Sequence, residues 1–331
     1  MVAQIDNTYK EYGIGKLLRR LVSYSMFEGR PHTTKGQWFN PVVRGFISTL
    51  KIIPQKNSTI KPVFIVGMGR SGTTILGLLL SVHKDVGFLN EPKAIWEIID
   101  SRHDISGDYI ADGGIYRLNE KDVSNIATRS AERIFSSYLK IIRGTRLVDK
   151  YPELVFRVDY LLKMFPDAKI VFITRNGSDA VHSVNSWSKH NGIAKKDSIE
   201  DWWGRDNIKW DYLTKQILLC DEYYKDVVSL ISSETDHLTR AILEWIVTMR
   251  EGMLQQEKYP RSMYKIAYED LVANSDEELK NLFDFCELEL DENVFSYARE
   301  KLYKMESKKK PNMEPMLEKI FDETMEKLGY E

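Results

Sequence analysis

Short apolar runs along the chain alternate with amphipathic segments, and this pattern predicts strands followed by helices. Continuous apolar runs are typical of strands buried on both faces of a parallel sheet, and the first is PVFIV at 62–66. Apolar positions at helical spacing follow most of these runs. The predicted strands are 62–66, 86–89, 147–148, 170–174 and 263–267, and the predicted helices are 73–82, 119–142, 153–164, 178–187, 199–230, 237–258, 277–285 and 292–304.

Strands that alternate with helices predict an α/β fold, in which a parallel sheet is flanked by helices on both faces. Ligands of such sheets bind beyond the carboxyl ends of the strands. The chain has 331 residues, of which 43% are hydrophobic, so it is long enough to bury a large core. We expect the main domain at 61–331, preceded by an N-terminal extension at 1–60.

The N-terminal extension contains a predicted basic amphipathic helix at 14–27. Its apolar residues share one face and are Leu17, Leu18, Leu21 and Val22. Its basic residues lie elsewhere on the helix and are Lys16, Arg19 and Arg20. Two interpretations stay open: the apolar face packs on the main domain with the charges in water, or the helix makes a peripheral contact with an anionic membrane.

Composition and charge exclude several classes of protein. The net charge is −2, without the basic excess that nucleic-acid binding usually brings. No run of about 18 apolar residues predicts a membrane-spanning helix, and the N-terminus lacks the apolar core of a secretory signal. Two cysteines, Cys220 and Cys286, do not make a disulfide framework, and we expect both to be buried thiols. A cytoplasmic protein fits this pattern.

The first candidate site is the segment Gly67-Met-Gly-Arg-Ser-Gly-Thr-Thr74, which joins a predicted strand to a helix. It resembles the phosphate loop G-x-x-x-x-G-K-[ST], but Thr73 stands where the lysine belongs. That lysine reaches the β and γ phosphates of ATP or GTP, so its absence points to another donor. Backbone N–H groups and the helix N-terminus still suit an anion. Arg70 adds a cation inside the loop.

The second candidate site lies about 100 residues later, at the end of the strand 170–174. Arg175 follows that strand, and Ser183 comes two helical turns later. An arginine at a strand end can bind a phosphate through two hydrogen bonds, and a serine hydroxyl adds a third.

Together these two motifs resemble those of sulfotransferases that use 3′-phosphoadenosine-5′-phosphosulfate (PAPS). The resemblance covers about 61–290 and favours the branch with carbohydrate and tyrosylprotein sulfotransferases and bacterial relatives. It implies a P-loop-like sheet and a 5′-phosphosulfate site that includes Gly69, Arg70, Ser71, Gly72, Thr73 and Thr74. It also implies that Arg175 and Ser183 bind the 3′-phosphate, which ATP lacks, and that no metal is required.

The resemblance also implies the residues of the chemical step. Glu91 matches the general base, and Lys150, which precedes Tyr-Pro, matches a lysine that stabilises the transferring group, with Arg70 as a second cation. His83 and His182 stay open as alternative bases. The aspartate next to the lysine, Asp149, could be misread as a metal ligand.

Further positions are assigned to the donor and the acceptor. Tyr268 matches a tyrosine that contacts the nucleotide, and the two acidic residues after it, Glu269 and Asp270, are expected to tie the loop to the core. Lys308, Lys309 and Lys310 stand where relatives carry a basic loop, and at least two are expected to be solvated. Trp202, Trp203 and Trp210 are candidates for an acceptor wall. The tryptophans expected in the core are Trp187 and Trp245.

The sequence therefore predicts transfer of a sulfuryl group to a hydroxyl, with a carbohydrate or glycolipid as the expected acceptor. The alternatives are a P-loop phosphotransferase, which would need the missing lysine and a Mg²⁺ aspartate, and an inactive nucleotide-binding scaffold.

Overall fold

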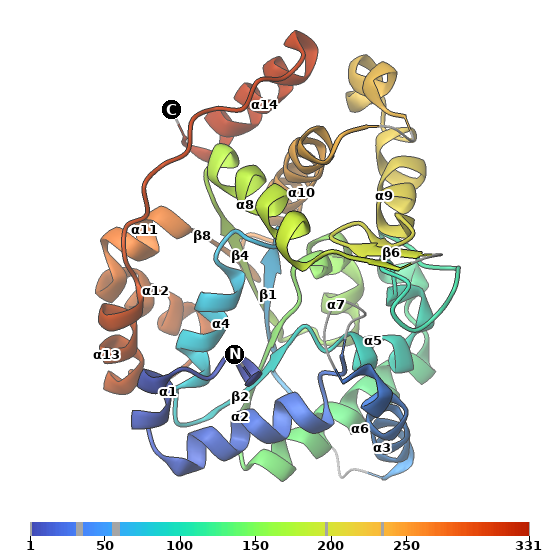
Figure 1. Cartoon of the computed structure of the whole chain (residues 1–331). Coiled ribbons are helices and arrows are strands. Elements are labelled where there is room, and N and C mark those ends of the chain that lie inside the picture. Colours follow the sequence, from blue (N-terminus) through green and yellow to red (C-terminus); the bar gives the residue numbers. More distant parts are fainter. Residues whose placement is uncertain (1, 31–35, 55–59, 196–197, 233–234, 331) are drawn as a thin grey trace.

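The computed structural model of the chain contains a five-stranded parallel sheet with helices on both faces (Figure 1). The structure describes residues 2–30, 36–54, 60–195, 198–232 and 235–330. The strand order is β2-β3-β1-β4-β8, and every neighbouring pair is parallel. The strands are β1 (Val63–Gly67), β2 (Val86–Asn90), β3 (Arg146–Lys150), β4 (Lys169–Thr174) and β8 (Met263–Ala267). The predicted α/β class is confirmed.

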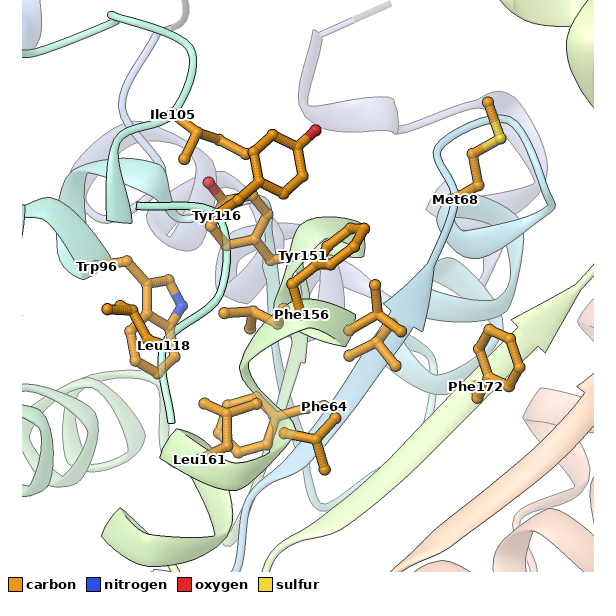
Figure 2. Close-up of a cluster of buried hydrophobic side chains, with 14 of the residues drawn as sticks. Phe64, Met68, Trp96, Ile105, Tyr116, Leu118, Tyr151, Phe156, Leu161 and Phe172 are labelled. Carbon is orange, nitrogen blue, oxygen red and sulfur yellow. The ribbon is translucent and has the colours of Figure 1, made fainter. Parts of the chain in front are cut away.

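Each central strand contributes to two cores, one on either face of the sheet. In β1, Phe64 and Val66 face one core, whereas Val63 and Ile65 face the other. This alternation explains why the strand is apolar at successive positions. Figure 2 shows part of the first core, where Phe64 lies among aromatic and aliphatic side chains from several elements.

Most predicted helices are present within a few residues of their expected bounds. The helices are α1 (Asn7–Glu11), α2 (Ile14–Met26), α3 (Asn40–Ile52), α4 (Thr73–Ser81), α5 (Lys93–Ile99), α6 (Asn125–Ile142), α7 (Val158–Met164), α8 (Gly177–Asn191), α9 (Ile208–Leu213), α10 (His237–Lys258), α11 (Tyr268–Ala273), α12 (Ser275–Cys286), α13 (Glu292–Lys301) and α14 (Pro315–Leu328). The helix predicted at 119–142 begins later, because Asn119 caps a separate 3₁₀ turn and Ser124 caps α6. The helices α3 and α14 were not predicted.

The long helix predicted at 199–230 is wrong. The chain instead forms β6 (Ser198–Asp201), β7 (Gly204–Arg205), α9, a π turn and a 3₁₀ helix, and β5 (Ile193–Lys195) pairs with β6 in a small antiparallel sheet. Gly204 has φ = 81° and Asn207 has φ = 65°. Both residue types tolerate the left-handed region, which interrupts a helix. The chain reverses between β6 and β7, and Asn207 caps α9.

The N-terminal extension packs along the edge of the sheet, with α2 against β2 and α3 against α6. In α2, Lys16 and Arg19 donate hydrogen bonds to backbone carbonyls just after α4, while Ile14 and Leu18 are exposed. Only the C-terminal part of the apolar face, which includes Val22, packs on the core. The interpretation with all charges in water is therefore wrong for this helix, and the division at residue 60 stays a prediction.

The two cysteines lie in different surroundings. Cys286 is buried as expected, but Cys220 is exposed, so the expectation of two buried thiols is wrong for Cys220. Within the described residues, no helix is long and apolar enough to cross a membrane.

Candidate active site

The loop Gly67–Thr74 joins β1 to α4 at the carboxyl edge of the sheet and depends on residues with positive φ. Gly67 has φ = 141° and Gly72 has φ = 92°. A Cβ atom on Gly67 would lie 2.5 Å from the carbonyl oxygen of Ile173, so only glycine fits there. Thr73 begins α4, and the N–H groups of the first turn are therefore available to an anion held by the loop.

Two arginines, one in this loop and one just after β4, lie next to each other. Arg70 lies in the loop itself with φ = 71°, and its Nε donates a 3.0 Å hydrogen bond to Oγ of Ser183 in α8. Arg175 follows β4, and its Nη1 donates a 2.8 Å hydrogen bond to the carbonyl oxygen of Arg70. These residues line the arginine cleft, which comprises Arg70, Arg175, Asp179, His182, Ser183, Ser186, Trp187, His190, Asn191, Met305, Glu306 and Lys308.

The arginine cleft has the properties of an anion site. Loss of solvation in the cleft, and then the charge of Arg175, lower the pKa of Arg70, although much of its side chain is exposed. Within the described residues, the buried Oγ of Ser71 and Nε of Arg175 have no hydrogen-bond partner. A bound anion would offset the repulsion between the charges of Arg70 and Arg175, and it would accept hydrogen bonds from these donors. The residues therefore fit the phosphate and sulfate groups of the expected donor.

Aromatic and acidic side chains hold Arg175 and its turn in place. The guanidinium of Arg175 lies 4.9 Å from the centre of the Tyr268 ring, which also packs over Gly72. Glu269 accepts a 3.0 Å hydrogen bond from the backbone N–H of Asn176, as expected for a residue that ties this loop to the core. Tyr268 thus lies beside both donor motifs.

The chain between α13 and α14 crosses the arginine cleft. Lys308 lines the cleft, and its backbone N–H donates a 2.6 Å hydrogen bond to Asp179. The backbone carbonyl of Lys309 lies 3.0 Å from Nε2 of His182. Lys310 instead forms ion pairs with two carboxylates of α14. Of the three lysines, only Lys308 lines the arginine cleft.

The predicted base and the predicted lysine meet at the ends of two neighbouring strands. Asn90 of β2 is paired with Lys150 of β3, so Glu91 follows directly at the edge of the sheet. The side chains of Glu91 and Lys150 form an ion pair, and the backbone N–H of Glu91 donates a 2.6 Å hydrogen bond to the carbonyl oxygen of Lys150. The lysine side chain is 1% exposed and that of the glutamate 39%. Glu91 has φ = 49°, a strained value for this residue type.

The side chain of Glu91 lines a second cavity on the other side of the loop. We name this cavity the carboxylate cleft. It is lined by Gly69, Glu91, Lys93, Ser106, Asp108, Pro152, Glu153, Trp187, Glu200, Asp201, Trp202, Gly204, Arg205 and Lys209. Gly69 lines this cleft and Arg70 lines the arginine cleft. The loop thus lies between the two cavities, with Glu91 on one side and the paired arginines on the other.

Buried ion pairs form much of the wall of the carboxylate cleft. Nζ of Lys93 lies 3.1 Å from a carboxylate oxygen of Asp108, and Nζ of Lys209 lies 3.3 Å from Glu153 and 2.6 Å from Glu244. Burial opposes the charges of both lysines, but the neighbouring carboxylates outweigh it and raise both pKa values. Burial likewise opposes the charge of Glu153, but Lys209 outweighs it and lowers the pKa of this carboxyl. The pairs are thus charged and fixed in place.

Two tryptophans also line the carboxylate cleft, and Nζ of Lys209 lies 4.8 Å from the centre of the Trp202 ring. The rings of Trp187 and Trp202 meet edge to face with centroids 5.4 Å apart, and Nε1 of Trp202 donates a hydrogen bond to Glu244. The expectation that Trp187 is core is wrong, because it lines both clefts. Trp203 and Trp210 are buried and do not line the carboxylate cleft, so of the three candidates for an acceptor wall only Trp202 does. Trp245 is buried as expected.

The two alternative bases, His83 and His182, do not line the carboxylate cleft with Glu91. His83 is buried at the far end of α4, where Nε2 contacts the carbonyl oxygen of Glu289 at 2.8 Å. His182 lines the arginine cleft. Asp149 is buried against Trp96, and burial raises its pKa to about 8. In the part of the chain that the structure describes, no three His, Cys, Asp or Glu side chains are grouped as metal ligands would be.

Sequence reasoning singled out Arg70, Arg175, Ser183 and Glu91, which line the two clefts, but it missed most of the carboxylate cleft. Lys93, Asp108, Glu153 and Lys209 were not singled out. Two of them had a local signal, since Lys93 follows Glu91 by two residues and Glu153 follows Lys150 by three. Asp108 and Lys209 reach the cleft only through tertiary packing.

Comparison with known proteins identifies relatives of the central part of the chain. A model of the sulfotransferase family matches residues 62–219. The nodulation protein NoeE of Sinorhizobium fredii is 30% identical over 128 residues, which are 37% of this chain and 30% of NoeE. A protein-tyrosine sulfotransferase of Drosophila melanogaster is 31% identical over 128 residues, 38% of this chain and 25% of that protein. The chain thus spans about a quarter to a third of the length of these relatives.

Solved structures show weaker similarity. A sulfotransferase domain from the curacin biosynthetic pathway aligns with a TM-score of 0.49 at 15% identity, over 83% of this chain and 99% of that domain.

Proposed function

We propose that this protein is a sulfotransferase that transfers a sulfuryl group from PAPS to an acceptor hydroxyl, because the model of the sulfotransferase family matches residues 62–219. The observation that carries the proposal is the meeting of Arg70, Arg175 and Ser183 in one cleft, with Glu91 on the other side of the same loop. A nucleotide with phosphates at two positions needs two separate anion sites, and the two arginines supply them.

The loop and the arginine cleft would hold the donor. The N–H groups of Gly72, Thr73 and Thr74 and the hydroxyl of Ser71 suit the 5′-phosphosulfate, and Arg175 with Ser183 suits the 3′-phosphate. When bound, the donor supplies a sulfuryl group that is activated by its link to phosphate. No residue here needs to become covalently bound to that group.

Glu91 is placed to accept a proton. Its carboxylate lies in the wall of the carboxylate cleft, where an acceptor hydroxyl would approach the loop. It would take the hydroxyl proton as the new oxygen–sulfur bond forms and the bond between sulfur and the phosphate oxygen breaks, so that 3′-phosphoadenosine-5′-phosphate leaves. Lys150, which was expected to stabilise the transferring group, is buried and forms an ion pair with this carboxylate, and Arg70 places a positive charge in the arginine cleft. Positioning and charge stabilisation are thus supplied from both sides of the reacting atoms.

A neutral, polyhydroxylated acceptor such as a carbohydrate or the headgroup of a glycolipid suits the carboxylate cleft better than an acidic one. Five carboxylates line this cleft against three cations. Carboxylates and ammonium groups bind hydroxyls well, and Trp202 offers an apolar face beside them. Tyrosylprotein acceptors remain the alternative because protein-tyrosine sulfotransferases are among the relatives. The acidic lining would disfavour such acceptors when they carry neighbouring acidic residues.

We also retain the peripheral membrane contact as a proposal, now limited to part of the predicted helix. Ile14 is 75% and Leu18 is 55% exposed on α2, one helical turn apart, and both could enter a lipid surface.

Calorimetric titration with 3′-phosphoadenosine-5′-phosphate (PAP) and with ADP tests the donor assignment. We expect PAP to bind at least tenfold more tightly than ADP, because only PAP has a 3′-phosphate. Equal affinity for PAP and ADP would instead favour the alternative function, a P-loop phosphotransferase. Release of PAP from PAPS is then measured with neutral glycans, a glycolipid and an acidic tyrosine peptide. Turnover with the tyrosine peptide alone would overturn the carbohydrate assignment.

A further inference from the structure

The N-terminal extension bonds directly to the backbone that carries Glu91. Glu28 follows α2, is 5% exposed, and its Oε1 accepts a 2.8 Å hydrogen bond from the backbone N–H of Asn90. Asn90 is the last residue of β2 and immediately precedes Glu91. The extension thus reaches the candidate base through one hydrogen bond and one peptide unit.

The hydrogen bond from Asn90 to Glu28 takes the place of one that a further strand would provide at the edge of the sheet. The strand β2 lies at the edge of the sheet and pairs only with β3 in the described sheet, so its outward backbone groups need other partners. Glu28 takes the N–H of Asn90, and the hydroxyl of Tyr138 donates a 2.9 Å hydrogen bond to the carbonyl oxygen of Phe88. Ser23 of α2 in turn lies 2.7 Å from that hydroxyl. Side chains therefore bond to two outward backbone groups of this edge, one of which belongs to the residue before Glu91.

Glu28 is itself held rigidly by a buried arginine. Arg20 forms a two-point ion pair with Glu28, and both side chains are almost fully buried, at 1% and 4% exposure. The remaining donors of Arg20 bond to the carbonyl oxygen of Ala3 and the side chain of Gln4, and its guanidinium lies over Phe88. A carboxylate anchored in this way cannot follow β2 if the strand moves.

The base needs such an anchor because its own backbone is strained. Glu91 has φ = 49°, and strained residues keep their conformation only where the surroundings hold them. Its N–H is fixed by the carbonyl oxygen of Lys150 on one side, and the preceding N–H is fixed by Glu28 on the other.

We propose that Glu28 is a positioning residue for sulfuryl transfer: it fixes the end of β2 so that Glu91 faces the acceptor. This inference rests on the proposed function for its consequence, but the hydrogen bond can be tested separately. It also gives the N-terminal extension a role in the reaction rather than in stability alone.

Two double variants distinguish the effect of the hydrogen-bond acceptor at position 28 from the effect of the buried charges. Arg20→Met with Glu28→Gln removes both charges and retains a side-chain carbonyl for the N–H of Asn90. Arg20→Met with Glu28→Leu removes the charges and the acceptor. Replacing a buried ion pair with neutral residues of similar volume is often tolerated, so both proteins should fold.

We expect the Leu variant to lose about tenfold or more in kcat relative to the Gln variant, because small displacements of a catalytic group are costly. The acceptor KM and the PAP affinity should agree between the two variants. Hydrogen exchange of peptide 86–93 should be faster in the Leu variant. Equal kcat and equal exchange in the two variants would overturn the proposal, as would a loss confined to KM.

The outcomes separate this proposal from the donor assignment. If the wild-type protein does not prefer PAP to ADP, the proposed function fails, while the exchange comparison still decides whether Glu28 holds β2. If neither double variant folds, Tyr138→Phe removes the neighbouring hydroxyl, with its contacts to Phe88 and Ser23, and leaves the charges of Arg20 and Glu28 in place. It should then lower kcat severalfold with unchanged PAP affinity, and unchanged kcat would refute the positioning role.

Discussion

Replacing Arg175 by alanine should remove the preference for a 3′-phosphate while leaving the rest of the donor site in place. Arg175 is 9% exposed, and its guanidinium is oriented by the carbonyl oxygen of Arg70 and by the ring of Tyr268. Its Nε is buried without a partner in the described part of the chain. The side chain is therefore held ready to bind an anion in the cleft.

The size of the effect follows from the hydrogen bonds that are lost. A hydrogen bond to a charged group contributes about 1.5–3 kcal/mol, and the fixed guanidinium can donate one or two to a phosphate. Loss of about 2–4 kcal/mol corresponds to roughly 30- to 1,000-fold weaker PAP binding. ADP has no 3′-phosphate, so its affinity should change by less than about threefold.

Calorimetric titration of both ligands into the wild type, Arg175→Ala and Arg205→Ala measures these values. Arg205 lines the carboxylate cleft but not the arginine cleft, so its variant is a matched loss of one arginine. Urea unfolding checks that Arg175→Ala remains folded, because the substitution also removes the contacts of the guanidinium with the carbonyl oxygen of Arg70 and the ring of Tyr268. Equal losses for PAP and ADP, or an equal loss of PAP binding in Arg205→Ala, would refute the assignment.

Three further predictions concern the candidate base, the loop and the exposed apolar residues of α2. Glu91→Gln should lower kcat by about 10²- to 10⁴-fold with PAP affinity unchanged; full turnover in a PAP-release assay would remove Glu91 as the base. Gly72→Ala should lower the free energy of unfolding by about 1–3 kcal/mol in urea titrations, because φ is 92° there and the new Cβ would overlap the Tyr268 ring; unchanged stability would contradict this geometry. Ile14→Asp with Leu18→Asp should abolish pelleting with vesicles of phosphatidylserine and phosphatidylcholine, whereas equal pelleting of variant and wild type would end the membrane proposal.

Local sequence was sufficient for the features whose residues are neighbours in the chain. The loop Gly67–Thr74 and its flanks combine a strand, three glycines and a helix start within a dozen positions, so its place in the fold could be predicted directly. The alternation of strands and helices likewise predicted the parallel sheet, because buried strands require continuous apolar runs. Arg175 could be placed at the same edge, since all parallel strands present their carboxyl ends together.

The same reasoning failed where a short-range signal was overridden. The apolar spacing in 199–230 resembles a helix, but the chain turns between β6 and β7 and forms part of the small sheet. Gly204 and Asn207 both have positive φ in this stretch. These two residues were visible as helix-interrupting signals in the sequence. Trp187 was expected in the core because tryptophans in helices usually are, yet it borders both clefts.

The sequence by itself therefore determined the class of fold, the donor loop and the candidate base, since each depends on contiguous residues and on strand geometry. Only the tertiary structure decided what surrounds Glu91. Lys209 and Asp108 come from distant segments, and Glu28 meets Asn90 across 62 positions of the chain. Such contacts satisfy buried charges and unpaired backbone groups, and no periodic pattern records which distant side chain will do so. The basic residues of α2 are an example. Lys16 and Arg19 bond to carbonyl oxygens just after α4, and Arg20 forms a buried ion pair with Glu28.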